Sequence, residues 1–379
     1  MRTALRPRPA APTSLRRLLV GVRGHGGEEV YSTLLHDYPP AAVSSVATFD
    51  FHASCAGARC HPLREVLLNR LVRPWLAFDL GFRVLDVGPD VDLVHVHSHP
   101  TVLRGLGRRP VVFSAGSSHW HYVRHYERWS EERIARRYAR ARRLYRRLGV
   151  LDALLTSERI TLAYTFSAEA REIYLRHGIP AWKIRVLPPG FDIPAAPVRR
   201  PRGTVTYLFL GRQPGRKGGP AVLDAFQRLR ATMPTARLLY VTDEPLPAPV
   251  PGVDARPLVP PSAVARLYGE ADVFVNPTRA EGFGFTNVEA QGFALPVVSS
   301  RLGAIPEVVD DGRTGFLIDP DDGEALLAAM RRLGADAGLR TAMARTARER
   351  FVARYALPVF QAALTDIYAE AVERAGSAP

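Results

Sequence analysis

The stretch TYLFLGRQPGRKGGPAVLDAF, residues 206–226, has the pattern of a buried strand, a glycine-rich loop and a helix. A strand that leads directly into a helix is the repeating unit of parallel α/β sheets. The loop presents backbone N–H groups and the positive end of a helix dipole to one point, which suits a phosphate. Arg212 and Lys217 would add charge-assisted contacts there. The spacing excludes a Walker A loop and a GxGxxG turn, and a solvated basic loop remains the structural alternative.

Strand-like runs alternate with helical patterns on both sides of this stretch, which predicts stacked βα units. The strands expected in the first half are residues 16–22, 91–97, 110–116 and 160–167. Those expected in the second half are residues 204–211, 236–243, 272–278, 296–300 and 315–319. Helical patterns begin near Glu28, Pro62 and Ser167, and a long helical tract begins near Gly323. The proline-rich segment 186–203 reads as a linker, so the sequence predicts two α/β domains with a cleft between them.

The composition is that of an ordinary soluble protein with an unusual basic charge. The 379 residues contain 46% hydrophobic and 23% charged residues, and no apolar run reaches the length of a membrane span. The basic N-terminal segment reads as a first strand rather than a signal peptide, and two cysteines favour a reducing cytoplasm. The net charge of +14 favours anionic partners such as nucleotides or anionic lipid. Nucleic acid is not expected, because no nucleic-acid-binding module is present.

A second strand–loop–helix pattern contains two glutamates, in EGFGFTNVEAQGFALPVV, residues 281–298. Gly282 and Gly284 predict a break, which would leave Glu281 in the loop and Glu289 on the first helical turn. Three interpretations are open. The glutamates could be a glycosidase pair, Thr286 and Glu289 could form a capping box, or the carboxylates could accept hydrogen bonds from the hydroxyl groups of a ligand.

These segments resemble the family-4 retaining glycosyltransferases of GT-B fold. The resemblance rests on Glu281 and Glu289 with seven residues between them, on the following segment 295–320 and on the loop 211–219, and it extends to residues 186–192 and 24–35 in the same order. It implies two Rossmann-like domains facing a central cleft, with residues 15–195 on the acceptor side and 203–350 on the donor side. A C-terminal helix within 351–379 would cross back to the first domain.

The resemblance also implies the activity and the site. The enzyme would move a hexose from a UDP- or GDP-sugar to an acceptor hydroxyl of a glycolipid, polysaccharide or small glycoside, by a front-face mechanism without a metal or other cofactor. Arg212 and Lys217 would hold the diphosphate, Glu281 the transferred sugar and Glu289 the ribose. The remaining donor contacts would come from Gly211, Gly282, Phe283, Gly284, Phe285 and Thr286. In the first domain, Gly26 and Gly27 would approach the donor and acceptor.

The chain departs from the family pattern at two places. Ser114 and Ala115 occupy the region in which family members often place a histidine, and His119 or His121 is expected to substitute as a catalytic residue. The usual glycine-rich turn after residues 238–241 is replaced by TDEPLPAPVPG, so the base of the donor is not predicted. The missing histidine keeps open a non-catalytic alternative, a sugar-nucleotide-binding partner of another transferase.

Three further segments have interpretations of their own. His95, His97 and His99 alternate along an expected strand, which suits either the end of a buried strand or a metal site. Cys55 and Cys60, flanked by His52 and His61, do not have a common zinc spacing. Residues 131–149 place an apolar stripe among eight arginines. This pattern fits either a helix packed on its own domain or a helix docked on anionic lipid, which would make the enzyme peripheral to the inner face of the membrane.

Overall fold

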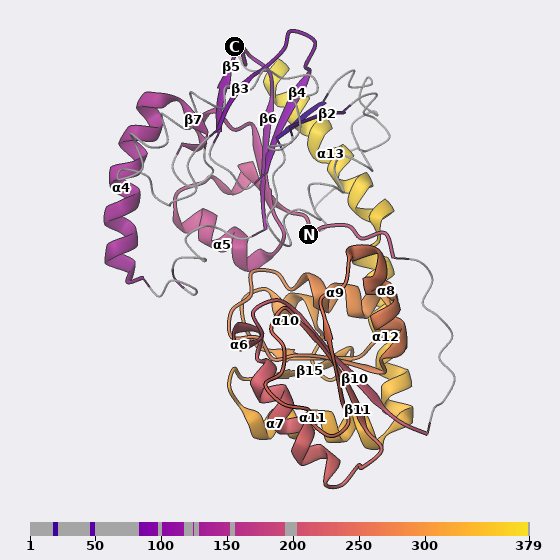
Figure 1. Cartoon of the computed structure of the whole chain (residues 1–379). Helices are drawn as coiled ribbons and strands as arrows, with labels where there is room; N and C mark the ends of the chain where they lie inside the picture. Colours follow the sequence, from indigo (N-terminus) through magenta and orange to yellow (C-terminus); the bar gives the residue numbers. More distant parts are fainter. Residues whose placement is uncertain are drawn as a thin grey trace, which may run out of the picture. The chain divides into compact units, whose positions relative to one another are not determined.

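The structure is a computed structural model of the whole chain (Figure 1). It describes residues 18–21, 46–49, 83–97, 101–116, 124, 129–151, 156–193 and 203–377. The chain divides into two units, each with its own sheet. Unit 1 comprises residues 1–166, 170–189 and 360–379, and unit 2 comprises residues 167–169 and 190–359.

Unit 1 contains a parallel sheet in the order β2-β1-β4-β6-β8-β9. The strands are β1 (Leu18–Gly21), β2 (Val46–Phe49), β4 (Leu93–His97), β6 (Val111–Ala115), β8 (Leu162–Thr165) and β9 (Ile184–Val186). All residues of β4, β6 and β8 are buried, as expected of parallel strands covered on both faces. The four strands predicted in the first half are confirmed, whereas β2 and β9 were missed because each is too short for a clear periodic pattern.

Unit 1 also contains a second, small sheet, which was not predicted from the sequence. Strand β5 (Thr101–Arg104) pairs in parallel with β3 (Arg83–Asp86) and antiparallel with β7 (Val150–Leu151). Helix α4 (Glu131–Leu148) leads into β7 and ends at Gly149 in the left-handed conformation. Helix α5 (Ala168–Arg176) follows β8.

The apolar stripe of α4 packs on its own unit. Ile134, Tyr138, Ala141 and Tyr145 are buried in the hydrophobic core of unit 1. The first of the two interpretations of residues 131–149 is therefore confirmed for the stripe, which is not available to a membrane. The arginines occupy the remaining faces of the helix.

Unit 2 contains a parallel sheet in the order β12-β11-β10-β13-β14-β15. The strands are β10 (Thr206–Leu210), β11 (Arg237–Thr242), β12 (Val253–Pro257), β13 (Val273–Asn276), β14 (Val297–Ser300) and β15 (Gly315–Ile318). All five predicted strands are confirmed, and only the half-exposed edge strand β12 was missed. Helices α7 (Gly219–Arg230) and α11 (Gly323–Ala335) lie side by side (Figure 1), with Phe226 and Met330 in the core. The other helices between the strands are α6 (Pro214–Lys217), α8 (Pro261–Glu270), α9 (Phe285–Gly292) and α10 (Ile305–Val308).

The helical tract predicted after Gly323 consists of three helices. α11 ends before Asp336, which accepts a hydrogen bond from the Leu339 amide and so caps α12 (Ala337–Arg354). α12 ends at Tyr355, and α13 (Leu357–Gly376) belongs to unit 1 from Phe360 onward.

The boundaries of the units differ from the predicted domain limits. Of the segment interpreted as a linker, Leu187 and Phe191 are buried, and the Phe191 amide donates to the Tyr355 carbonyl at 2.8 Å. This part of the segment is packed rather than free, and the chain enters the main part of unit 2 at 189/190 instead of within 195–203. The return crossing falls at 359/360, inside α13, because α12 still belongs to unit 2.

Candidate functional site in unit 2

Two loops of unit 2 meet where the strand order changes direction. The chain runs from β10 outward to β11 and later returns to β13, which pairs with the other side of β10. Ligands of open α/β sheets bind at such a position, outside the carboxyl ends of the strands. The loop after β10 and the loop after β13 are joined by backbone: the Arg279 amide donates to the Arg216 carbonyl at 2.9 Å. The guanidinium of Arg216 also donates to the Ala280 carbonyl at 2.8 Å.

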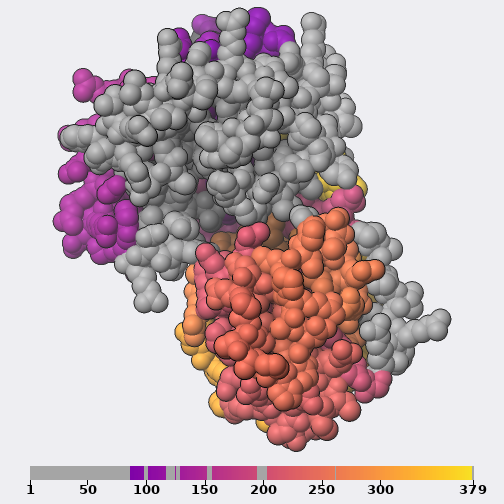
Figure 2. All heavy atoms as spheres, in the orientation of Figure 1, coloured from indigo at the N-terminus to yellow at the C-terminus, as the bar shows by residue number. Residues whose placement is uncertain are grey.

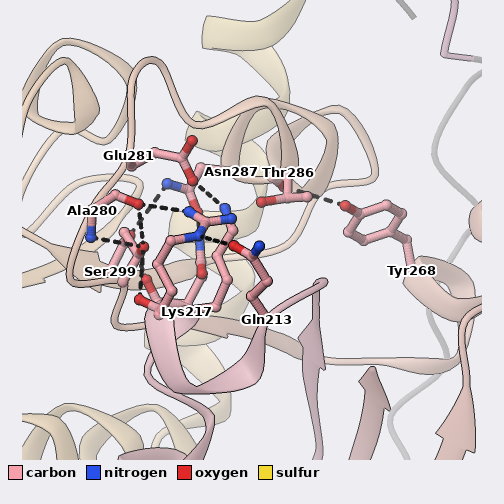
Figure 3. Close-up of polar contacts among 11 residues, drawn as sticks. Gln213, Lys217, Tyr268, Ala280, Glu281, Thr286, Asn287 and Ser299 are labelled. Atoms are coloured by element: carbon pink, nitrogen blue, oxygen red, sulfur yellow. Dashed lines mark hydrogen bonds and ion pairs between the residues drawn. The ribbon is translucent and has the colours of Figure 1, made fainter. Parts of the chain in front are cut away.

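Lys217 and Glu281 form an ion pair between these loops (Figure 3). Their side chains are only 11% and 13% exposed, so the pair is shielded from solvent on most sides. Lys217 is the last residue of α6, and the left-handed Gly218 ends that short helix. The two side chains predicted to hold the diphosphate and the sugar are therefore neighbours. The solvated-loop alternative is wrong for Lys217, which is buried, whereas Arg212 of the same loop is exposed.

The loop that carries Lys217 is held in an unusual conformation. Gln213 is a non-glycine residue at φ 56° and ψ 66°, a left-handed geometry that costs free energy outside glycine. Its amide donates to the Asp243 carboxylate at 2.8 Å, and its side-chain oxygen accepts from Arg216 at 2.8 Å. Asp243 lies just beyond β11, so the adjacent strand fixes the loop. Gln213, Arg216 and Asp243 were not identified from the sequence, because no local pattern marks them.

The loop before α9 contains Glu281, as the two glycines predicted. Gly284 has a φ of 92° and is the N-cap of α9, and no side chain caps this helix. Thr286 is thus inside the helix, and its buried hydroxyl oxygen has no hydrogen-bond partner. The capping-box alternative is wrong. Glu289 is the fifth residue of α9, one position beyond the predicted first turn, and its carboxylate bonds elsewhere.

The carboxylate of Glu289 is held by a tyrosine from α8. The Tyr268 hydroxyl donates to one oxygen of Glu289 at 2.7 Å. Desolvation raises the pKa of Glu289 above its ordinary value, although the bond from Tyr268 and the charge of Lys217 act in the opposite direction. Burial also raises the pKa of Tyr268, which keeps its hydroxyl protonated as a donor. The charge of Lys217 acts on Glu289 as well as on Glu281, so three of the four predicted charged side chains, Lys217, Glu281 and Glu289, lie in one region.

Behind the loop, a buried amide network attaches α9 to the sheet. Asn287 accepts from the Asn276 amide at 3.3 Å and donates to the Ser299 hydroxyl at 3.2 Å (Figure 3). Ser299 in turn donates to the Asn276 carbonyl at 2.8 Å. Because all three residues are fully buried, this network fixes the start of α9 against β13 and β14.

The other predicted site residues fall into two groups. Arg212 is exposed, Gly211 follows β10, and Phe283 is buried with its ring edge-on to Phe285 at 5.6 Å. The predicted residues Gly26, Gly27, His119 and His121 lie outside the described part of the chain, as do His99, His52, Cys55, Cys60 and His61.

In unit 1, the two described histidines of β4 belong to a buried hydrogen-bond chain. His95 bonds to the Tyr368 hydroxyl of α13 and to the Ser114 hydroxyl, both at 2.8 Å, and His97 reaches Ser114 at 2.7 Å. Burial lowers the pKa of His95 to about 3, so it is neutral. The buried-strand interpretation is confirmed for His95 and His97. Among the residues that the structure describes, no group of three or more His, Cys, Asp or Glu side chains could hold a metal ion.

Comparison with known families places unit 2 in context. Residues 204–336 match the family described as Glycosyl transferases group 1. The D-inositol 3-phosphate glycosyltransferase of Acidothermus cellulolyticus is 31% identical over 230 residues, which is 53% of this chain and 50% of that protein. The chain spans about half the length of this relative, 25% of that of the relative from Corynebacterium kroppenstedtii and 58% of that of the relative from Xylanimonas cellulosilytica.

Solved structures show the same fold over nearly the whole chain. Anabaena Alr3699/HepE in complex with UDP-glucose has a TM-score of 0.64 at 16% identity, covering 93% of this chain and 98% of that one. Sucrose-phosphate synthase of Thermosynechococcus elongatus has a TM-score of 0.63 at 18% identity, with the same two coverages. At these identities the likeness concerns the fold alone.

Proposed function

We propose that this chain, whose residues 204–336 match the family described as Glycosyl transferases group 1 and whose fold is that of solved glycosyltransferases, transfers a hexose from a nucleotide-diphosphate sugar to an acceptor hydroxyl. The observation that carries the proposal is the convergence of Lys217, Glu281 and Glu289 at the carboxyl ends of β10 and β13. A cation beside two carboxylates suits a ligand with one anionic part and several hydroxyl groups. We do not propose that Glu281 and Glu289 act as a glycosidase pair, because Glu281 is ion-paired to Lys217 and Glu289 is held by Tyr268.

In this proposal each group has one task. Lys217 and the exposed Arg212 bind the diphosphate, and the positive end of α9, which no side chain caps, faces the same charge. Glu281 accepts hydrogen bonds from the transferred sugar, and Glu289 accepts them from the ribose. The donor's diphosphate therefore replaces Glu281 as the main partner of Lys217 when it binds.

The proposed reaction proceeds on one face of the sugar. The bond from the anomeric carbon to the diphosphate oxygen breaks, and the acceptor oxygen forms the new bond on the same face, so the configuration is retained. The departing diphosphate takes the acceptor's proton, and Lys217 stabilises the negative charge that develops on it. The chain's own cations perform this role in the proposal, so no metal is required. The acceptor is a hydroxyl of a glycolipid, polysaccharide or small glycoside.

Thermal melting with UDP, GDP and ADP tests the donor site. A nucleotide present at 100 times its dissociation constant is expected to stabilise the folded protein by about 2.7 kcal/mol. Glu289→Gln should lose most of this increment, because the amide accepts fewer hydrogen bonds from ribose. The same variant should melt at or above the wild-type temperature at pH 7. The raised pKa means that the ionised carboxylate costs stability above that pKa, and the neutral amide avoids this cost.

The opposite results would contradict the proposal. If none of the three nucleotides stabilises the wild type, the donor site as described is wrong. If a nucleotide binds but a labelled sugar nucleotide is not turned over with any acceptor hydroxyl, either with or without EDTA, the non-catalytic alternative takes precedence, whereas turnover that EDTA abolishes would contradict the metal-free mechanism. If a nucleotide stabilises the wild type and Glu289→Gln equally, Glu289 does not bind the ribose.

We further propose that the protein is cytoplasmic and docks on anionic membrane through the arginines of α4. This helix lies at the surface of unit 1 (Figure 2), and six of its eight arginines are exposed. The attraction is electrostatic alone, since the apolar stripe is buried. Within the described ranges no helix is sufficiently long and apolar to span a bilayer.

Sedimentation with anionic vesicles tests this docking. Each basic residue near the surface contributes about 1 kcal/mol, so replacing Arg136, Arg143 and Arg147 by glutamine should weaken binding roughly 100-fold at low salt. The matched control replaces three exposed arginines of unit 2, Arg331, Arg345 and Arg354, which changes the net charge equally. Equal loss in both variants would indicate that total charge, and not α4, governs binding.

A further inference from the structure

We infer that Tyr268 is a positioning residue of the donor site, which acts by fixing the carboxylate of Glu289 for the ribose. This inference rests on the proposed function and extends it to a residue of α8 that no motif in the sequence identified. It is carried by the hydrogen bond, the packing of the tyrosine ring and the surroundings of the carboxylate.

The tyrosine ring is held by packing, so its hydroxyl has a fixed position. Tyr268 is 0% exposed. Its ring stacks on Phe293 with centroids 5.1 Å apart and planes 11° apart, and it contacts Phe274 at a centroid distance of 5.8 Å. The hydroxyl reaches Glu289 at 2.7 Å and points toward Thr286 of the same helix (Figure 3), whose carbonyl lies at 3.4 Å. A rigid aromatic donor therefore meets the more flexible glutamate.

The bond leaves Glu289 with unused acceptor capacity. An ionised carboxylate has about four acceptor positions on two oxygens, and the hydroxyl of Tyr268 uses one of them on a single oxygen. Glu289 is partly exposed, although its neighbours in α9, Val288 and Ala290, are fully buried. Tyr268 thus restricts the rotamers of Glu289 without blocking it, which is the arrangement that a preorganised site for two adjacent hydroxyl groups needs.

Tyr268 also favours the ionised form that binds hydroxyl groups. Two groups lower the pKa of Glu289 against the effect of desolvation: the hydroxyl of Tyr268 on α8 and the ammonium of Lys217 on α6. Removing the hydroxyl leaves only Lys217, so the pKa of Glu289 should rise further. Nucleotide affinity should then begin to fall at a higher pH than in the wild type as the solution is made more acidic.

The test is Tyr268→Phe, with Tyr207→Phe as its matched control. Tyr207 is also fully buried in unit 2, and its hydroxyl donates to the Met330 carbonyl at 2.8 Å, so the control loses the same atom and a comparable bond. The probes are UDP and GDP and their 2′-deoxy forms. We expect Tyr268→Phe to bind the preferred nucleotide about tenfold more weakly and to discriminate less against the 2′-deoxy form. As the solution is acidified, its affinity should begin to fall at a higher pH than that of the wild type. Tyr207→Phe should retain the wild-type affinity, discrimination and pH profile.

The outcomes separate this inference from the proposed function. If the wild type binds nucleotides and Tyr268→Phe matches it in affinity, discrimination and pH profile, the inference is wrong and the proposed function stands. If Tyr268→Phe fails to fold, the hydroxyl is structural and the inference is also wrong. If the wild type binds none of the probes, both the inference about Tyr268 and the proposed function are wrong. A last check is the double variant with Glu289→Gln, which should bind no more weakly than Glu289→Gln alone, because Tyr268 acts through that residue.

Discussion

Replacing Lys217 by methionine is expected to reduce sugar transfer by about 100-fold to 1,000-fold, the usual effect of removing one group that stabilises a developing charge. Methionine keeps most of the volume but removes the charge, so it also leaves the partly buried carboxylate of Glu281 without its ion-pair partner. The melting temperature should therefore fall as well. Initial rates with a labelled sugar nucleotide, together with thermal melting, measure both effects.

A second substitution separates the loss of activity from the loss of stability. Adding Glu281→Gln to Lys217→Met removes the unpaired carboxylate and should restore the melting temperature, while transfer stays lost. Lys183→Met is the matched control, since it replaces the only other lysine, which lies in unit 1 and bonds to the Ser157 carbonyl. A Lys217→Met protein that retains more than a tenth of the wild-type rate would contradict the assigned role.

Gly218→Ala is expected to damage both the fold and the site. Gly218 has a φ of 81°, and a Cβ atom there would lie 2.1 Å from the Pro277 carbonyl oxygen. Both the left-handed backbone and this close approach exclude a side chain. We expect a loss of about 3 kcal/mol in the free energy of unfolding, or roughly 6–12 °C in melting temperature. Because Pro277 follows β13, relief of the clash would also separate Lys217 from Glu281 and weaken nucleotide binding.

Gly215→Ala provides the control in the same loop. A Cβ atom at Gly215 would meet no heavy atom within 4 Å, and its backbone has no positive φ. This variant should melt within about 1 °C of the wild type, because substitutions at such surface positions usually change stability by no more than 0.5 kcal/mol. If both alanine variants behave alike, the contact of Gly218 with Pro277 does not hold the two loops together.

Local pattern was sufficient for most of the architecture. Strands β10, β11, β13, β14 and β15 each contain an apolar run, and such runs separated by helical patterns specify a parallel sheet. The glycines of the loop 281–284 were likewise sufficient to place Glu281 outside the helix. Each of these conclusions depends on residues that are neighbours in the sequence, and backbone propensity and periodicity act at that range.

Which side chains form the site depends on contacts between residues that are far apart in the sequence, and local sequence patterns do not encode such contacts. Lys217 and Glu281 are 64 positions apart, and Tyr268 reaches Glu289 from a different helix across 21 positions. The apolar stripe of α4 was equally suited to a membrane and to a protein core, and only the tertiary structure decided for the core. The sequence by itself determined most strands of the two large sheets, the loop that holds Glu281 and the apolar face of α4. The order and register of the strands determined which of those faces and loops meet, because burial requires an apolar partner but does not specify which one.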